Sequence, residues 1–129
     1  MHTFKVLTVV AVLAAIIISA GIVANSSFST SANRLDTHIE NIEKTVSDGN
    51  WSGAEESLLS IQNYWSKIQD LWAALLDHAE MDNIDATLSR LEKYIKSRDK
   101  ALTLGEASLL KLYVKHIPEK EKFNLSNVL

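Results

Sequence analysis

The sequence predicts an all-α protein, with a single N-terminal transmembrane helix followed by an antiparallel four-helix bundle. Residues Val6 to Ala24 form 19 consecutive positions without a charge. The rest of the chain repeats its apolar residues at the helical spacings of three and four. Strand signals are missing, because the chain has one proline and four glycines and lacks alternating apolar runs and hairpin dipeptides.

The apolar run has the length of a membrane span. Nineteen helical residues extend about 28 Å, close to the roughly 30 Å hydrocarbon core of a bilayer. Only the α-amino group, His2 and Lys5 precede the run, and the next basic residue is Arg34. Because positive charge resists translocation, this asymmetry predicts a cytoplasmic N-terminus and an extracytoplasmic C-terminal domain. We therefore expect a signal-anchor that contacts the lipid bilayer through residues 4–24.

A cleaved signal peptide is the alternative to a retained anchor. Small residues stand at the −3 and −1 positions of two candidate cuts, at Ala24 and Ser26 and at Ser19 and Gly21. The apolar core of a signal peptide is usually shorter, about 7 to 15 residues, so retention is favoured. Small residues four apart in the run would also let two anchors pair, although ordinary alanine content of a spanning helix is the favoured explanation. They are Ala11, Ala15 and Ser19.

The chain divides into a cytoplasmic stub and transmembrane segment (1–24), a polar stalk (25–33) and an extracytoplasmic helical domain (34–129). The stalk sequence is also compatible with the start of the next helix. The domain carries 12 basic and 16 acidic residues. This charge balance lacks the excess of basic residues that is typical of nucleic-acid binding. The absence of cysteine excludes a disulfide framework and thiolate chemistry.

Apolar stripes place four helices in the domain. The first helix ends at Gly49, which accepts the left-handed conformation, and the second begins with the capping-box pair Ser52 and Glu55. A turn at 97–99 separates the third helix from the fourth, which Pro118 closes before a last short apolar segment. The stripes are Leu35, Ile39, Ile42 and Val46; Ala54, Leu58, Ile61, Trp65, Ile68, Trp72 and Leu75; Met81, Ile84, Leu88, Leu91 and Ile95; Leu102, Leu109, Leu112 and Val114; and, in the last segment, Phe123, Leu125, Val128 and Leu129.

One polar group has the spacing of a metal site. On a helix, His78, Asp82 and Asp85 lie at i, i+4 and i+7, and an imidazole with two carboxylates suits zinc or manganese. A structural role is favoured, because Asp77 and Glu80 have capping-box spacing for the third helix and acidic residues stabilise its N-terminal end. We therefore predict no metal or other cofactor, and keep these three residues as the metal-ligand candidates.

Charge is distributed unevenly along the domain. Residues 36–85 contain 11 acidic and 2 basic side chains, and residues 90–115 contain 7 basic and 3 acidic ones. Lys93, Lys96 and Lys100 are the interaction candidates. A solvated face is the favoured reading, and anionic lipid or an acidic partner is the alternative.

The order of several short motifs is similar to an uncharacterised bacterial family, domain-of-unknown-function family 4363. The motifs are Asn50-Trp51, the run from Asp77 to Ile84, Leu91 with Tyr94-Ile95, His116-Ile117-Pro118 and Asn127-Val128-Leu129. The resemblance implies a short membrane-anchored protein of spore-forming Gram-positive bacteria. It also implies an accessory partner of a multispanning membrane protein, in some cases linked with sporulation, and it names no chemistry.

No phosphate-binding loop, nucleophile elbow or zinc-protease motif occurs. The sequence therefore predicts a non-enzymatic membrane-anchored accessory or scaffold protein, whose extracytoplasmic bundle binds another membrane or envelope protein. A homo-oligomer is compatible with this expectation. The alternative is a ligand- or metal-sensing extracytoplasmic helical bundle.

Overall fold

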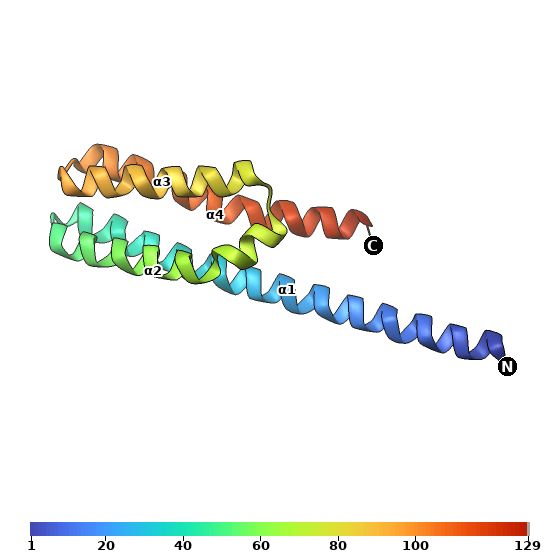
Figure 1. Ribbon diagram of the computed structural model, residues 1–129. Coiled ribbons are helices and arrows are strands. Elements are labelled where there is room, and N and C mark those ends of the chain that lie inside the picture. The colour runs from blue at the N-terminus through green and yellow to red at the C-terminus, as the bar shows by residue number, and fades with distance from the viewer. Residues whose placement is uncertain (129) are drawn as a thin grey trace.

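The computed structural model consists of four helices and describes the backbone of residues 1–128 and the side chains of residues 1–23 and 26–116. The helices are α1 (His2–Ser47), α2 (Trp51–Leu75), α3 (His78–Lys96) and α4 (Lys100–Val128). No strand occurs within residues 1–128. The N-terminal half of α1 projects away from the other helices (Figure 1). The prediction of an all-α protein is therefore confirmed.

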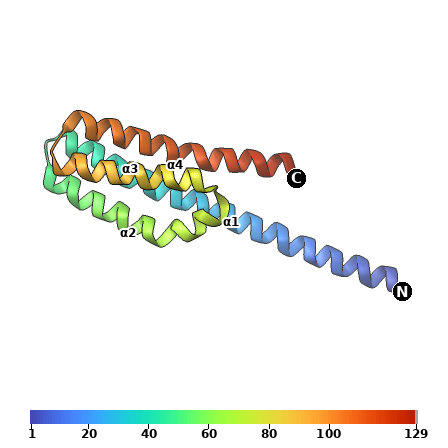
Figure 2. The ribbon, with the colours of Figure 1, turned by 45° about the horizontal axis from the view of Figure 1, so that its top comes forward.

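The helices form a ring in which each one packs against two others. Among the described residues, α1 contacts α2 and α4, and α3 contacts the same two helices. The connections at 48–50 and 97–99 lie together at one end of the bundle, which we call the distal end (Figures 1 and 2). The connection between α2 and α3 lies at the other end, called proximal here, where α1 leaves the bundle. Short connections of this kind favour contact between consecutive helices.

α1 is one unbroken helix of 46 residues. Its N-terminal part is exposed, and it is long and apolar enough to cross a membrane. The helix continues through residues 25–33, so this segment is the start of the first bundle helix and not a separate polar stalk. Phe28, Ser31 and Ala32 are buried in the bundle. The Phe28 ring packs on the Trp72 ring with 4.4 Å between centroids, a contact that makes this stretch part of the core.

The apolar stripes predicted for the first three bundle helices mostly form the core. Every predicted residue of the first stripe is buried, and the second and third stripes are buried apart from three positions. Ile68 and Met81 are half-buried, and Leu75 is 37% exposed. Leu76 is buried in place of Leu75, because α2 ends at Leu75 and the extended backbone of Leu76 turns its side chain inward.

The N-terminal cap of α2 differs from the prediction. Asn50 occupies the cap position, and its Oδ1 accepts the Gly53 N–H at 2.9 Å, so Ser52 is already inside the helix. A side chain at position 53 would crowd the Asn50 amide, since a Cβ there would lie 2.6 Å from Nδ2. Gly49 has a φ of +73°, which confirms it as the residue at the end of α1.

α4 also differs from the prediction. The helix continues to Val128, so the expectation that Pro118 closes it is wrong. Proline removes one amide donor and disfavours continuation of a helix without forbidding it. Of the predicted stripe, Val114 is buried as expected, whereas Leu102 and Leu112 are 49% and 57% exposed and Leu109 is half-buried. The other buried residues of α4 are Thr103, Ala107 and Leu110. The docking predicted for Phe123, Leu125, Val128 and Leu129 lies outside the described side chains.

Candidate functional site

The three metal-ligand candidates do not converge on one point. His78, Asp82 and Asp85 are exposed on α3, and Asp85 Oδ1 accepts the indole N–H of Trp65 at 2.8 Å. Within the described residues, no group of three His, Asp or Glu side chains has an arrangement that could hold a metal ion. Asp85 therefore provides the hydrogen-bond acceptor for the buried Trp65. The sequence signal for this role is that a buried indole N–H needs an acceptor.

The capping interpretation of the same segment is confirmed at its first residue. Asp77 precedes α3, and its Oδ1 accepts the backbone N–H of Glu80 at 2.9 Å. This bond satisfies one of the amides that a helix start leaves without an intrahelical partner. The acidic segment at residues 77–85 thus begins α3 and ties α3 to α2.

The three candidate lysines lie at the distal end, on two different helices. Lys93 and Lys96 are exposed in the last turn of α3, where positive charge is favoured by the helix dipole. Lys96 Nζ lies 3.0 Å from Glu92 Oε1. Lys100 begins α4 and donates to the backbone carbonyl of Ser47 at 3.2 Å, so it joins the start of α4 to the end of α1.

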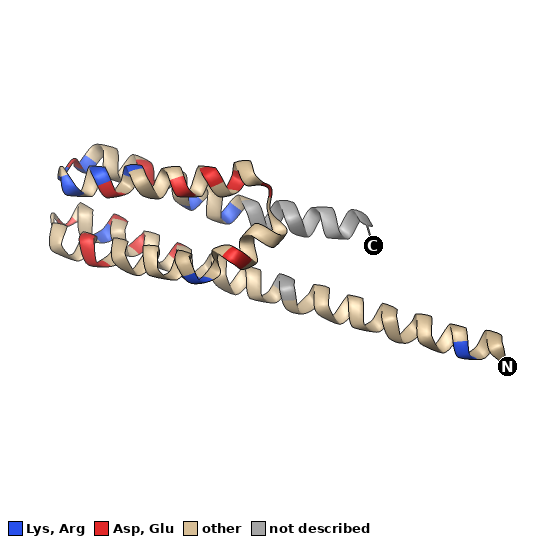
Figure 3. Ribbon diagram, viewed as in Figure 1, with Lys and Arg blue, Asp and Glu red and all other residues tan. Residues whose placement is uncertain are grey.

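The position of these lysines bears on lipid contact. Figure 3 shows charged residues spread over the bundle, while the projecting part of α1 is almost uncharged. Residues 24 to 47 of α1 extend about 35 Å as a helix. Lys93 and Lys96 therefore lie far from the apolar end of α1.

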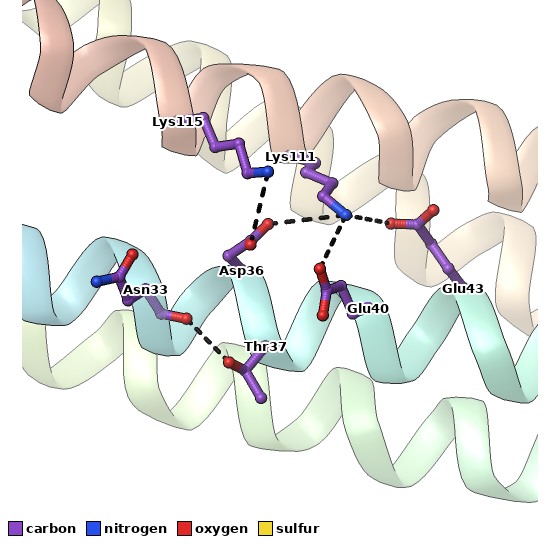
Figure 4. Close-up of polar contacts among 7 residues, drawn as sticks. All are labelled: Asn33, Asp36, Thr37, Glu40, Glu43, Lys111 and Lys115. Carbon is purple, nitrogen blue, oxygen red and sulfur yellow. Dashed lines mark hydrogen bonds and ion pairs between the residues drawn. The ribbon is translucent and has the colours of Figure 1, made fainter.

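The strongest electrostatic feature joins α1 to α4, and we call it the α1–α4 charge cluster. It consists of Asp36, Glu40 and Glu43 on one face of α1 and Lys111 and Lys115 on α4 (Figure 4). Lys111 Nζ lies 3.2 Å from Glu40 Oε1, 3.6 Å from Glu43 Oε1 and 4.0 Å from Asp36 Oδ1. Lys115 Nζ lies 3.8 Å from Asp36 Oδ2. Three carboxylates thus face two ammonium groups.

The cluster keeps Lys111 charged. The hydrogen bond to Glu40 raises the pKa of Lys111 above its usual value, and the nearby charges of Glu43 and Asp36 add to the effect against the opposing influence of desolvation. A protonated lysine is neither a nucleophile nor a base, so this arrangement suits a structural link. The sequence signal for the cluster is the helical spacing of its residues, i, i+4 and i+7 for the three acidic residues and i, i+4 for the two lysines. Counting charges along the chain did not reveal the cluster.

A second ion pair fixes the other side of α4. Arg90 on α3 pairs with Glu106 on α4, and the carboxylate of Glu106 is largely buried. α4 is therefore held by charge on both of its flanks, toward α1 and toward α3.

Comparison with known proteins identifies a family and no activity. Residues 22–128 match the family described as Domain of unknown function (DUF4363). No curated protein and no solved structure matches the chain.

Proposed function

Because the chain belongs to the DUF4363 family, whose description names no activity, we propose a function from its geometry. The protein is a non-enzymatic, membrane-anchored accessory or scaffold protein, and its helical bundle binds another membrane or envelope protein. One observation carries the proposal: α1 runs as a single helix from exposed apolar residues into the core at Phe28. Because the bundle shares a helix with its anchor, its distance from the membrane and its orientation are fixed. A surface that is presented to a partner in the same membrane requires such a fixed position.

The finer arrangement is part of the same proposal. The apolar helix is a retained signal-anchor with its N-terminus in the cytoplasm, which the basic residue Lys5 before the apolar run supports. The bundle is antiparallel and extracytoplasmic. The family resemblance supports a setting in spore-forming Gram-positive bacteria and a multispanning membrane protein as the partner.

The proposed contact surface is the distal end of α3. Lys93 and Lys96 are exposed there, and the ion pair of Lys96 with Glu92 lies within α3. Lys100, Lys111 and Lys115 are instead engaged with α1. Clustered lysines attract acidic surfaces and raise the rate of association. The partner is therefore expected to present acidic side chains at a height of about 35 Å from the anchor, the length of α1 from residue 24 to residue 47.

Affinity purification with charge-reversed variants tests this function. The full-length chain, tagged and expressed in its native cells, is recovered from detergent-solubilised membranes together with its partners. The double variant Lys93→Glu/Lys96→Glu is compared with Lys67→Glu, which reverses an exposed lysine on α2. We expect one recurrent multispanning protein with the unchanged chain and with Lys67→Glu, and at least fivefold less of it with the double variant. Equal recovery with all three chains, or no recurrent partner, would contradict the proposal.

A further inference from the structure

The last turns of α2 expose an apolar flank at the proximal end of the bundle. Four apolar residues share one side of α2, because they lie four, three and four positions apart. They are Tyr64, Ile68, Leu71 and Leu75. The first two are half-buried, whereas Leu71 and Leu75 are 36% and 37% exposed. The flank therefore becomes more exposed toward the end of the bundle where α1 leaves it (Figures 1 and 2).

Contacts between α2 and α1 show where this flank ends. The Tyr64 ring lies 6.1 Å from the ring of His38 and 5.9 Å from the guanidinium carbon of Arg34. Farther along α2, the Trp72 ring packs on Phe28 with 4.4 Å between centroids. Along α2 toward its C-terminal end, the contacts on α1 thus move toward the apolar run.

The distance of the two exposed leucines from the apolar run follows from helix geometry. Phe28 is four residues beyond Ala24, the last residue of the run, so it lies about 6 Å farther along α1. Leu71 and Leu75 lie about 1.5 Å and 4.5 Å along α2 on either side of Trp72, the residue that contacts Phe28. The polar layer on each side of a bilayer is about 5–8 Å thick. Both leucines are therefore at the level of the headgroups of a bilayer that α1 crosses.

We propose that Leu71 and Leu75, the leucine pair, form a second membrane contact by entering this headgroup layer. The inference rests on the proposed anchoring. Apolar side chains on a helix at the boundary between headgroups and acyl chains bind by leaving water. The part of α1 at the same level suits this layer, since residues 6–33 carry no charge. Asp70 and Asp77 border the segment and are exposed, so the contact depends on apolar burial and not on attraction to anionic lipid.

The second contact sets the direction in which the bundle leans. A single spanning helix can tilt and rotate in the bilayer, and residues that anchor it at the interface restrict both motions. The leucine pair lies on α2, to one side of α1, so burial of the pair makes the bundle lean toward α2. The contact therefore deepens the proposed scaffold role, because it fixes the tilt of the bundle as well as its distance from the membrane.

Fluorescence quenching from the lipid headgroups tests this contact, because the chain contains no cysteine of its own. The full-length chain is labelled with bimane at Leu71→Cys, Leu75→Cys or Leu59→Cys. It is then reconstituted in phosphatidylcholine vesicles with or without lipid that carries a nitroxide on its headgroup. Leu59 is the matched control, since it is 59% exposed on the same helix and lies about 20 Å along α2 from Trp72. We expect at least threefold stronger quenching at residues 71 and 75 than at residue 59.

A second comparison separates contact from mere closeness to the membrane. Leu71→Asp, combined with the label at Leu75→Cys, is expected to lower the quenching at residue 75 at least twofold. Leu59→Asp with the same label should leave it unchanged. Circular dichroism melts show whether each chain is folded. Leu71→Ala, which removes most of the apolar side chain without adding a charge, gives the same comparison if the aspartate variant does not fold.

Two results would overturn the contact while the chain stays in the vesicles. One is equal quenching at residues 59, 71 and 75. The other is quenching at residue 75 that neither substitution of Leu71 changes, because α1 alone would then impose the closeness. Flotation of the vesicles reads the anchoring separately, and a chain that does not float with them would refute the anchor and the contact that rests on it. The vesicles contain no other protein, so the result is independent of the partner proposed above.

Discussion

At the scale of single residues, two tryptophans one heptad apart on α2 have different surroundings. The indole N–H of Trp65 donates to Asp85 at 2.8 Å and so ties α2 to α3. Trp72 is fully buried, with its ring on Phe28 and edge-to-face with Trp65 at 5.4 Å between centroids. Its N–H has no hydrogen-bond partner among the described atoms. Such an unpaired group costs about 1–3 kcal/mol, which the burial of the large ring offsets.

Truncation of Trp65 or its acceptor is expected to destabilise the bundle by different amounts. Trp65→Ala should lower the free energy of unfolding by about 3–5 kcal/mol, because a buried aromatic leaves a cavity. Asp85→Ala should lower it by about 1–2 kcal/mol, because it leaves the indole N–H unpaired. Asp82→Ala removes an exposed carboxylate three residues away and should cost less than about 0.5 kcal/mol. Urea unfolding of the micelle-bound chain, followed by circular dichroism, measures all three. Equal stability of the two aspartate variants would contradict the role given to Asp85.

At the scale of helices, local patterns in the sequence predicted most of the fold. The helical spacing of apolar residues predicted the core face of α1 and most of the core faces of α2 and α3, and the capping pattern predicted the start of α3 at Asp77. These features depend only on residues within one or two helical turns. The face of α4 was predicted wrongly because the large leucines were taken as its core. The structure buries Thr103 and Ala107 instead. Small residues carry little periodic signal, and only the neighbouring helices determine that they face inward.

The relations between helices were the part that sequence alone did not provide. The metal candidates His78, Asp82 and Asp85 had suitable spacing, yet Asp85 is directed to Trp65, which lies 20 residues earlier on another helix. The same holds for the α1–α4 charge cluster, in which Glu40 and Lys111 are 71 residues apart. Spacing within a helix shows which side chains share a face, whereas the partner of that face depends on the packing of the whole bundle.

The α1–α4 charge cluster is expected to make the stability of the bundle depend on pH in the alkaline range. The pKa of Lys111 is raised in the folded state above its usual 10.5, so the folded state holds this proton more tightly than the unfolded state. Its stabilisation is therefore complete below the unfolded pKa and is lost as the pH rises through the folded pKa.

Lys111→Met measures this contribution. The variant should be less stable than the unchanged chain by about 1 kcal/mol or less at pH 8, and the difference should shrink above the usual pKa of lysine. Unfolding free energies of both chains at pH 8 and in strong alkali give the two differences. Lys67→Met, an exposed lysine of α2, is the control and should show little difference at either pH. A difference for Lys111→Met that does not change with pH would mean that its charge is not the source of the stabilisation.

At the scale of the whole molecule, α1 serves two environments with one helix. Its exposed apolar part suits lipid, and its C-terminal part supplies six of the nineteen buried apolar residues that the structure describes. The unbroken helix means that rotation or tilt of its apolar part moves the bundle with it. The orientation of the distal lysines Lys93 and Lys96 is therefore fixed relative to α1 by the packing of the bundle.

The membrane topology is the property on which these relations depend. We expect the full-length chain to stay in membranes after an alkaline carbonate wash, because an apolar helix of this length is held by the bilayer and not by charge. A reporter that is active only outside the cytoplasm should be active when fused after Leu129, and inactive when fused before Met1. Inserting three arginines after Leu129 should not reverse this, whereas moving the positive charge of Lys5 to position 26 should weaken the orientation. Recovery of a soluble mature form that starts between Gly21 and Ser27 would show cleavage instead. Such a cut would leave Phe28 at or near a new N-terminus, and the bundle would then be a secreted domain without an anchor.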